Sequence, residues 1–225
     1  MEGSPYSLPS VNLSTSPPVP FSKAIRAATT AAHGTAEQAG YLGALLAGNL
    51  DIPGYARLVA QHLHIYRALE GAADALAGDP VARRFVFEEL RRLPSLEADL
   101  EALLGAGWAS QVPALPATEA YCARLREVGA TWVGGFVAHH YVRYLGDLSG
   151  GIFIGEAVER IYDIVDHRGT SFYVFERIPD PMAFKDTYRG LLDDAPWDDT
   201  ERALITAEIL EGYRFNTEVL EQLGA

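Results

Sequence analysis

The sequence predicts a single-domain, all-α protein, and three observations support that fold class. From Phe21 onward, apolar residues recur at spacings of three and four, which is the period of an amphipathic helix. Proline and glycine divide this pattern into segments of helical length. The chain has 225 residues, of which 48% are hydrophobic, so it can bury one substantial core.

Residues 1–20 differ from the rest of the chain, and we expect them to form a disordered tail. They contain five prolines and five serines but no basic residue. A secretory signal would need a positive start and a continuous apolar stretch, and both are missing here. The amphipathic run that ends the chain predicts no membrane anchor. We therefore expect the helical domain to span residues 21–225 and the protein to be cytoplasmic.

About eight helices are expected from the positions of the breaks. The first spans Ser22–Ala39 with Ser22 as its cap, and the second follows Pro53 and ends at Leu76, before Gly78-Asp79-Pro80. The remaining helices are expected at Val81–Arg92 and Ser95–Leu104, and from Glu119, Trp132, Met182 and Asp199 onward. The segment His167–Pro181 fits either a short strand or an irregular loop.

The helix that starts near Trp132 is unusual because Gly146, Gly150, Gly151 and Gly155 lie inside it. Each interior glycine destabilises a helix by about 1 kcal/mol relative to alanine, so the four together cost about 4 kcal/mol. Gly146 and Gly150 share a face, where the bare backbone can approach a flat or bulky object, and glycine also permits a kink. Close packing against another helix is the alternative explanation.

A possible ligand site lies on the first predicted helix. Arg26, Thr30, His33 and Glu37 follow one another at spacings of four, three and four, so they share a face. A histidine in such a position is often structural. Glu37, however, lies one turn later and can accept a hydrogen bond from the ring, as the partners of metal-bound imidazoles do.

Charged residues suggest two further sites. Lys185 and Arg189 are four residues apart in a chain that has only two lysines. A solvated patch is the simpler explanation, yet an acidic protein that binds a dianionic ligand needs local positive charge of this kind. Asp147 lies four residues after Arg143, which fits either a structural salt bridge or a polar site. The net charge of −12 argues against nucleic acid or an anionic membrane as the main partner.

Two strings of sequence resemble those of a known family. The string RYLGDLSGG is similar to the signature of the heme oxygenases, and the departure from many relatives comes just after it, at Ile152. The string IRAATTAAHGTAEQA resembles the proximal helix of the same family. The resemblance implies an all-α fold in which heme b lies between the helix that carries His33 and a kinked helix that carries Gly146 and Gly150.

The resemblance also assigns roles to individual residues. It implies that His33 coordinates the iron, that Glu37 holds the histidine ring, and that Arg26 contacts a heme propionate. Thr30 stands where some relatives carry a second lysine. Further propionate contacts are implied for Tyr141, Lys185 and Arg189, and a catalytic group on the distal side of the heme is implied for Tyr66, Arg143, Gly146, Asp147, Gly150 and Asn216.

The implied reaction is the opening of heme by O₂ and electrons to biliverdin, free ferrous iron and CO, with heme as both substrate and cofactor. Water ordered by Asp147 would deliver a proton. The electron donor would be a ferredoxin, a flavodoxin or a reductase flavoprotein, and a candidate docking surface, which is also explained by simple solvation, comprises Arg83, Arg84, Arg91 and Arg92. The alternatives are a non-catalytic heme carrier or sensor, and an unrelated helical enzyme that binds another planar ligand.

Overall fold

The computed structural model describes residues 19–37 and 40–224, without the side chains of residues 31–37. The described residues contain helices and no strand, which confirms the predicted fold class. The α-helices are α1 (Phe21–Glu37), α2 (Gly40–Leu46), α3 (Ile52–Ala75), α4 (Leu93–Leu104), α5 (Pro116–Thr131), α6 (Val133–His140), α7 (Ile152–Tyr162), α8 (Pro181–Asp193) and α9 (Asp199–Gly224).

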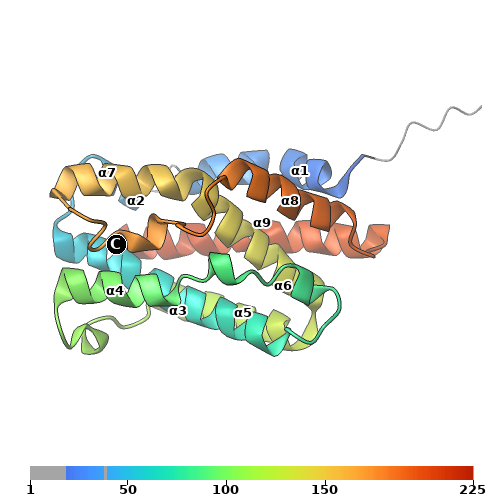
Figure 1. The fold of residues 1–225 in the computed structure, drawn as a ribbon, viewed down its shortest axis with the longest axis horizontal. Helices are drawn as coiled ribbons and strands as arrows, with labels where there is room; N and C mark the ends of the chain where they lie inside the picture. The colour runs from blue at the N-terminus through green and yellow to red at the C-terminus, as the bar shows by residue number, and fades with distance from the viewer. Residues whose placement is uncertain (1–18, 38–39, 225) are drawn as a thin grey trace, which may run out of the picture.

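The long helix α9 organises the rest of the fold. It runs along the long axis of the molecule, with α7 and α8 on one side of the view and α4 and α5 on the other (Figure 1). Helices α1, α2, α3, α5 and α6 all contact it. The helices share one core of buried apolar side chains, in which Ile205 and Ile209 of α9 are fully buried.

The predicted helix after Pro53 is confirmed as α3, because its local signals and its packing agree. The side chain of Asp51 caps the helix by accepting a hydrogen bond from the backbone N–H of Gly54, and Pro53 lies in the first turn. The other predicted starts, near Ser95, Glu119, Met182 and Asp199, lie within three residues of the observed ones.

Two predictions about local structure are wrong. Ser22 does not cap α1; it lies inside the helix, and its backbone N–H and hydroxyl both donate to the carboxylate of Asp193. The predicted helix at Val81–Arg92 is replaced by two short 3-10 turns, η1 (Ala82–Arg84) and η2 (Glu88–Leu90).

The second error has a tertiary cause. The carboxylate of Glu70 in α3 accepts hydrogen bonds from the backbone N–H groups of Arg92 and Leu93, at 2.6 and 3.2 Å. Phe85 and Leu90 are fully buried at the same time. These contacts draw the segment onto α3, and helix propensity is too weak to resist them.

The glycine-rich helix is π-helical over much of its length. After α6, the chain continues through η4 (Tyr141–Leu145) and η5 (Asp147–Gly151), which are π-helical and flank Gly146, before α7 begins. In such turns the backbone hydrogen bond joins residues five apart, and they occur frequently at functional sites. This segment from Tyr141 to Gly151 is called the distal helix below. The predicted kink is thus present as a local change of helix type.

The segment His167–Pro181 forms a loop and not a strand. Its one regular element is η6 (Ser171–Tyr173), a single 3-10 turn. The buried carboxylate of Asp99 in α4 holds this turn, because it accepts hydrogen bonds from the backbone N–H groups of Ser171 and Phe172, each at 2.8 Å. The loop thereby brings Phe172 and Tyr173 into the core.

A buried ion pair ties three helices together behind the distal helix. Glu208 of α9 accepts two hydrogen bonds from Arg124 of α5, at 2.8 and 2.6 Å, and lies 2.8 Å from Nε2 of His139 in α6. Burial raises the pKa of Glu208, but the hydrogen bonds from Arg124 and His139 outweigh burial and bring this pKa to about 2. The ionised carboxylate therefore stabilises the fold.

Candidate functional site

The glycines of the distal helix fall into two groups with different surroundings. A Cβ atom built on Gly146 or Gly150 would meet no heavy atom of the described chain within 4 Å. A Cβ atom on Gly155 would lie 2.7 Å from the Cβ atom of Tyr173. Close packing therefore explains Gly155, whereas Gly146 and Gly150 leave an open face of bare backbone, which fits a flat ligand lying against the helix.

A cavity of about 170 Å³ lies against this open face. Residues from α2, α3, α9 and the η6 turn complete its wall. Its apolar lining includes Leu42, Leu58, Ile154 and Leu220, and its polar lining includes His62, Arg143, Asp147 and Asn216. A mostly apolar cavity with a few convergent polar groups has the character of a ligand site.

Asp147 is the carboxylate of this cavity. It is 8% exposed, and its Oδ2 atom accepts a hydrogen bond from the hydroxyl of Tyr66 in α3. Its Oδ1 atom has no donor among the described residues. Burial raises the pKa of Asp147, while the positive charge of Arg143 and the hydrogen bond from Tyr66 oppose that shift. One carboxylate oxygen is thus fixed, and the other is left to the cavity.

Arg143 is held away from Asp147. Its Nη1 atom donates to Oδ1 of Asn216 at 2.8 Å, and its guanidinium lies 5.0 Å from the centre of the Tyr66 ring. Within the described part of the chain it makes no ion pair with Asp147, so the direct salt bridge considered from the sequence does not form. In a π-helical turn the neighbour of residue 143 along the axis is five residues on, not four.

A second group of predicted residues gathers at one edge of the site. Burial raises the pKa of Tyr141, and the positive charges of Arg189 and Arg26 lower it. Helix α1, which carries Arg26, contacts helix α8, which carries Arg189. Arg189 is half-buried and forms an ion pair of 2.7 Å with Asp186. Arg26 is exposed on α1. This edge therefore offers two cations and a phenol to a ligand.

Lys185 does not belong to a solvated patch, contrary to the simpler of the two explanations. It is 7% exposed, and its Nζ atom donates to the carbonyl of Leu148 at 3.2 Å and to the hydroxyl of Ser149 at 3.0 Å. Burial lowers the pKa of Lys185, and the charge of Arg189 adds to that shift. The lysine thus braces the end of the distal helix from α8.

The predicted axial residues lie on α1. His33 and Glu37 fall within its bounds, but their side chains lie outside the described residues. The backbone of α1 packs against α8 and α9. Thr30, one turn before His33, is exposed and donates to the carbonyl of Arg26 at 2.7 Å. Its hydroxyl is therefore engaged within its own helix.

The candidate docking surface of four arginines is wrong in part. Arg92 is buried, and its Nη1 atom donates to the carbonyl of Val174 at 2.7 Å. Arg91 is engaged by Asp74 and Glu88 at 2.6 and 2.9 Å. Of the four, Arg83 is the exposed one and Arg84 is half-buried. No local pattern in the sequence indicates that Arg91 and Arg92 serve the packing of this segment.

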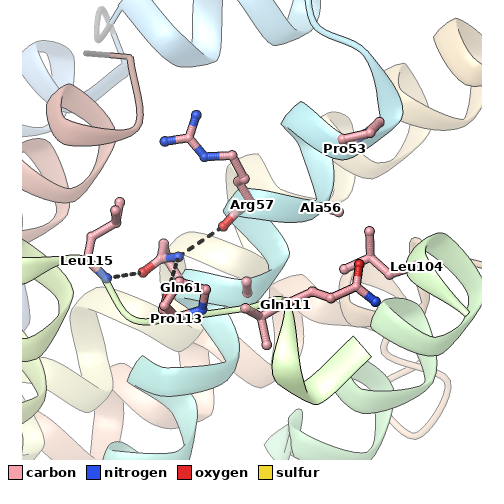
Figure 2. Close-up of a pocket in the computed structure, with 10 residues that line it drawn as sticks. Pro53, Ala56, Arg57, Gln61, Leu104, Gln111, Pro113 and Leu115 are labelled. Atoms are coloured by element: carbon pink, nitrogen blue, oxygen red, sulfur yellow. Dashed lines mark hydrogen bonds between the residues drawn. The ribbon is translucent and has the colours of Figure 1, made fainter. Parts of the chain in front are cut away.

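A larger cavity, of about 310 Å³, shares no lining residue with the cavity of Asp147 (Figure 2). It separates the first half of α3 from the loop that precedes α5. Gln61 spans it, donating to the carbonyls of Pro113 and Arg57 at 3.2 and 3.3 Å and accepting from the backbone N–H of Leu115 at 2.9 Å (Figure 2). The bonds to Pro113 and Leu115 fasten the loop to α3, so we assign this cavity to packing.

One lining residue of the distal cavity was missed from the sequence. His62 lies in α3 four residues before Tyr66, and its ring lines the cavity that Asp147 also lines. His64 lies on another side of α3, where its Nε2 atom is 2.8 Å from the carbonyl of Val112. The signal that identifies His62 is its spacing of four from Tyr66, which puts the two residues on one face of the helix.

Comparisons with known proteins agree with this geometry. The family profile described as "Heme oxygenase" matches residues 19–222. "Heme oxygenase 1" of Nostoc sp. is 35% identical over 199 residues, covering 88% of this chain and 84% of that protein. "Heme oxygenase 1" of Rattus norvegicus is 33% identical over 207 residues, covering 91% and 72%.

Solved structures agree as well. The crystal structure of heme oxygenase-1 from the cyanobacterium Synechocystis in complex with heme matches with a TM-score of 0.86 and 34% identity, covering 91% of this chain and 92% of that one. Heme oxygenase from Leptospira interrogans also matches with a TM-score of 0.86, at 30% identity, covering 91% and 100%. The chain therefore belongs to the heme oxygenase family.

Proposed function

We propose that this chain carries out the reaction of its family, the opening of heme by O₂ and electrons to biliverdin, free ferrous iron and CO. The observation that carries the proposal is the open backbone face at Gly146 and Gly150 with the buried carboxylate of Asp147 between them. A flat ligand fits that face because no heavy atom of the described residues lies within 4 Å of a Cβ atom built on either glycine. The chain is accordingly an oxidoreductase of the heme oxygenase type.

Heme would lie between α1 and the distal helix. His33 would bind the iron from α1, with Glu37 holding its ring, because both residues share the face of α1 that carries Arg26. When bound, heme supplies the iron at which O₂ is activated and is itself the molecule that is oxidised. Gly146 and Gly150, which carry no side chain, would leave room for O₂ between the heme and the distal helix.

The propionates would lie at the edge formed by α1, α8 and the first turn of the distal helix. Arg26, Tyr141 and Arg189 come from these three elements, of which α1 and α8 contact each other. Lys185, four residues before Arg189, adds a buried ammonium group. Charge-assisted hydrogen bonds from these groups orient a dianionic ligand as well as attract it.

Asp147 would hold the water that delivers a proton. Its Oδ2 atom is occupied by the hydroxyl of Tyr66, so Oδ1 is the atom that can accept from water in the cavity. Arg143 and Asn216 are joined to each other and line the same cavity, where they limit the positions that water can take. Tyr66, Arg143 and Asn216 therefore act by positioning Asp147 and its water.

A heme carrier or sensor would need the axial histidine and the cations but no proton delivery. The buried group around Asp147 therefore favours the enzyme, because burying a carboxylate costs free energy even when one of its oxygens is hydrogen-bonded, and a carrier would gain nothing from it. For the donor we propose a redox protein, either a ferredoxin, a flavodoxin or a flavoprotein reductase. Among the described residues, no helix has both the length and the apolar content that a membrane span requires.

The test is aerobic incubation of the hemin complex with a reductant, followed by spectra of the product. We expect an absorption band of bound heme on addition of hemin, and its replacement by that of biliverdin as iron is released. The matched control is the His33→Ala variant, which should form neither complex nor product until imidazole is added. Heme that stays intact in the reduced, aerated complex would refute the enzyme and favour the carrier.

A further inference from the structure

The lining of the distal cavity includes a titratable side chain, His62, which the proposed mechanism does not use. Its ring lines the same cavity as Gly146, Asp147 and Gly150. The ring packs on Phe172, with 5.0 Å between the ring centres, and more loosely on Tyr66, at 6.5 Å. Burying an imidazole in an apolar wall costs free energy, since its polar nitrogens lose their hydrogen bonds to water.

The hydrogen bonding of this imidazole is incomplete within the described part of the chain. Its Nδ1 atom is fully buried and has no partner, and no hydrogen bond is made by Nε2 either. Nε2, unlike Nδ1, is not among the fully buried atoms without a partner, so it is the nitrogen that borders the cavity. Burial holds the pKa of His62 well below its usual value of 6.5, and the charge of Arg143 adds to that effect. The ring is thus neutral and carries one N–H group.

The position of that proton follows from the burial of Nδ1. Buried N–H groups without a partner are rarer in proteins than acceptors without one, so the proton belongs on Nε2. The group that the ring presents to the cavity is then a hydrogen-bond donor. The carboxylate of Asp147, across the same cavity, presents the acceptor atom Oδ1. A water molecule between a donor and an acceptor has both of the partners that it needs.

We propose that His62 is a positioning residue of the distal cavity, whose Nε2–H group donates to the water held by Asp147. This inference rests on the proposed function, because the water matters only if it delivers a proton. The imidazole fixes the water from α3 while Asp147 fixes it from the distal helix. With both partners present, one hydrogen of the water points to Asp147 and the other is directed toward the ligand face.

Two substitutions separate this role from packing. His62→Phe keeps an aromatic ring against Phe172 and removes the donor, whereas His62→Gln keeps an N–H donor on a side chain of similar reach. His64→Gln is the matched control, because His64 lies on another side of α3 and faces the carbonyl of Val112. All three variants should bind hemin, since none of these residues is proposed to contact the iron.

The first readout does not depend on turnover. In the protein without heme, ¹⁵N spectra of histidine should show one signal with the proton on Nε2 that does not titrate between about pH 5 and 8, and this signal should vanish in His62→Phe. In the ferrous complex with CO, His62→Phe should raise the C–O stretching frequency, because the water that donates toward the CO oxygen would no longer be held by His62. His62→Gln and His64→Gln should leave that frequency close to the original.

The second readout is the rate of biliverdin formation per bound heme. Loss of one neutral hydrogen bond should slow His62→Phe by about 3- to 10-fold, with His62→Gln largely restored. An unchanged rate and C–O frequency in His62→Phe would overturn the proposal and leave a packing role. So would a low-spin ferric spectrum typical of two histidine ligands that disappears in His62→Phe, because His62 would then be an iron ligand and not a donor to water. Failure of the proposed function is distinct, since the unaltered protein would then form no biliverdin.

Discussion

Alanine at Gly146 or Gly150 should make the protein without heme more stable and at the same time impair heme binding. In the fold itself nothing opposes the added methyl group, because no described heavy atom lies within 4 Å of the new Cβ position at either site. The same methyl group would stand on the face where the heme plate is proposed to lie. The substitution should therefore raise the stability of the protein without heme and lower its affinity for hemin, a combination that few substitutions produce.

The magnitudes follow from the geometry. Replacing an interior helical glycine by alanine stabilises by about 1 kcal/mol, and in a chain of this size that raises the thermal midpoint by about 2–4 °C. On the ligand side, an extra methyl in a close contact costs about 1–3 kcal/mol, which is about a 5- to 150-fold loss of affinity. Gly155→Ala is the control, since its Cβ would lie 2.7 Å from that of Tyr173 and should lower the midpoint.

The assay is thermal unfolding of each variant without heme, followed by titration with hemin and a single turnover. A lower midpoint for Gly146→Ala and Gly150→Ala would refute the argument, because these glycines would then serve the packing of the helix. Unchanged hemin affinity and product would refute it in another way, since the open face would not be where the ligand lies. A lower midpoint in Gly155→Ala alone, with weaker hemin binding in the other two, is the expected pattern.

Four further results are expected. His33→Ala should lose the ferric spectrum of bound hemin, with partial return on addition of imidazole, as absorption spectra would reveal. Asp147→Ala should bind hemin but form no biliverdin, and Asp147→Asn should be milder; a less stable protein with normal product per bound heme would contradict the role in proton delivery. The double variant Lys185→Ala and Arg189→Ala should bind hemin about 10-fold more weakly, as measured by titration. Unchanged affinity would show that these two residues do not bind the propionates. The pKa of Glu208 is lowered from 4.5 to about 2, so its ionised form should contribute about 3 kcal/mol of stability above pH 4.5, lost as the pH falls through 2; denaturant unfolding of the original and Glu208→Gln should converge over that range.

Most of the fold could be predicted because most helices carry their own signals. A capping aspartate and an early proline identify the start of α3, and a regular apolar period carries it to its end. The segment from Val81 to Arg92 has a comparable pattern, yet it folds as two short turns because Glu70 and the core draw it onto α3. A local pattern contains no information about a carboxylate twenty residues away, so this error could not have been avoided.

The sequence predicts which residues form the site better than it predicts how their side chains are paired. The spacing of Gly146 and Gly150 predicted a shared open face, and that face is present. The pairing of Asp147 with Tyr66 instead of Arg143 depends on π-helical turns, which rotate residues relative to an α-helix. The histidines of the sequence were interpreted only as possible metal ligands, so His62 was not predicted as a hydrogen-bond donor in a cavity wall.

The brace formed by Lys185 has a consequence for the entropy of ligand binding. A free lysine side chain loses about 2 kcal/mol of rotamer entropy when it is held in one position. Here two of its three N–H donors already bond to Leu148 and Ser149, and the third remains for another acceptor. This conformational entropy is lost when the chain folds. A carboxylate that arrives at the ammonium group later therefore meets a side chain that has no further freedom to lose.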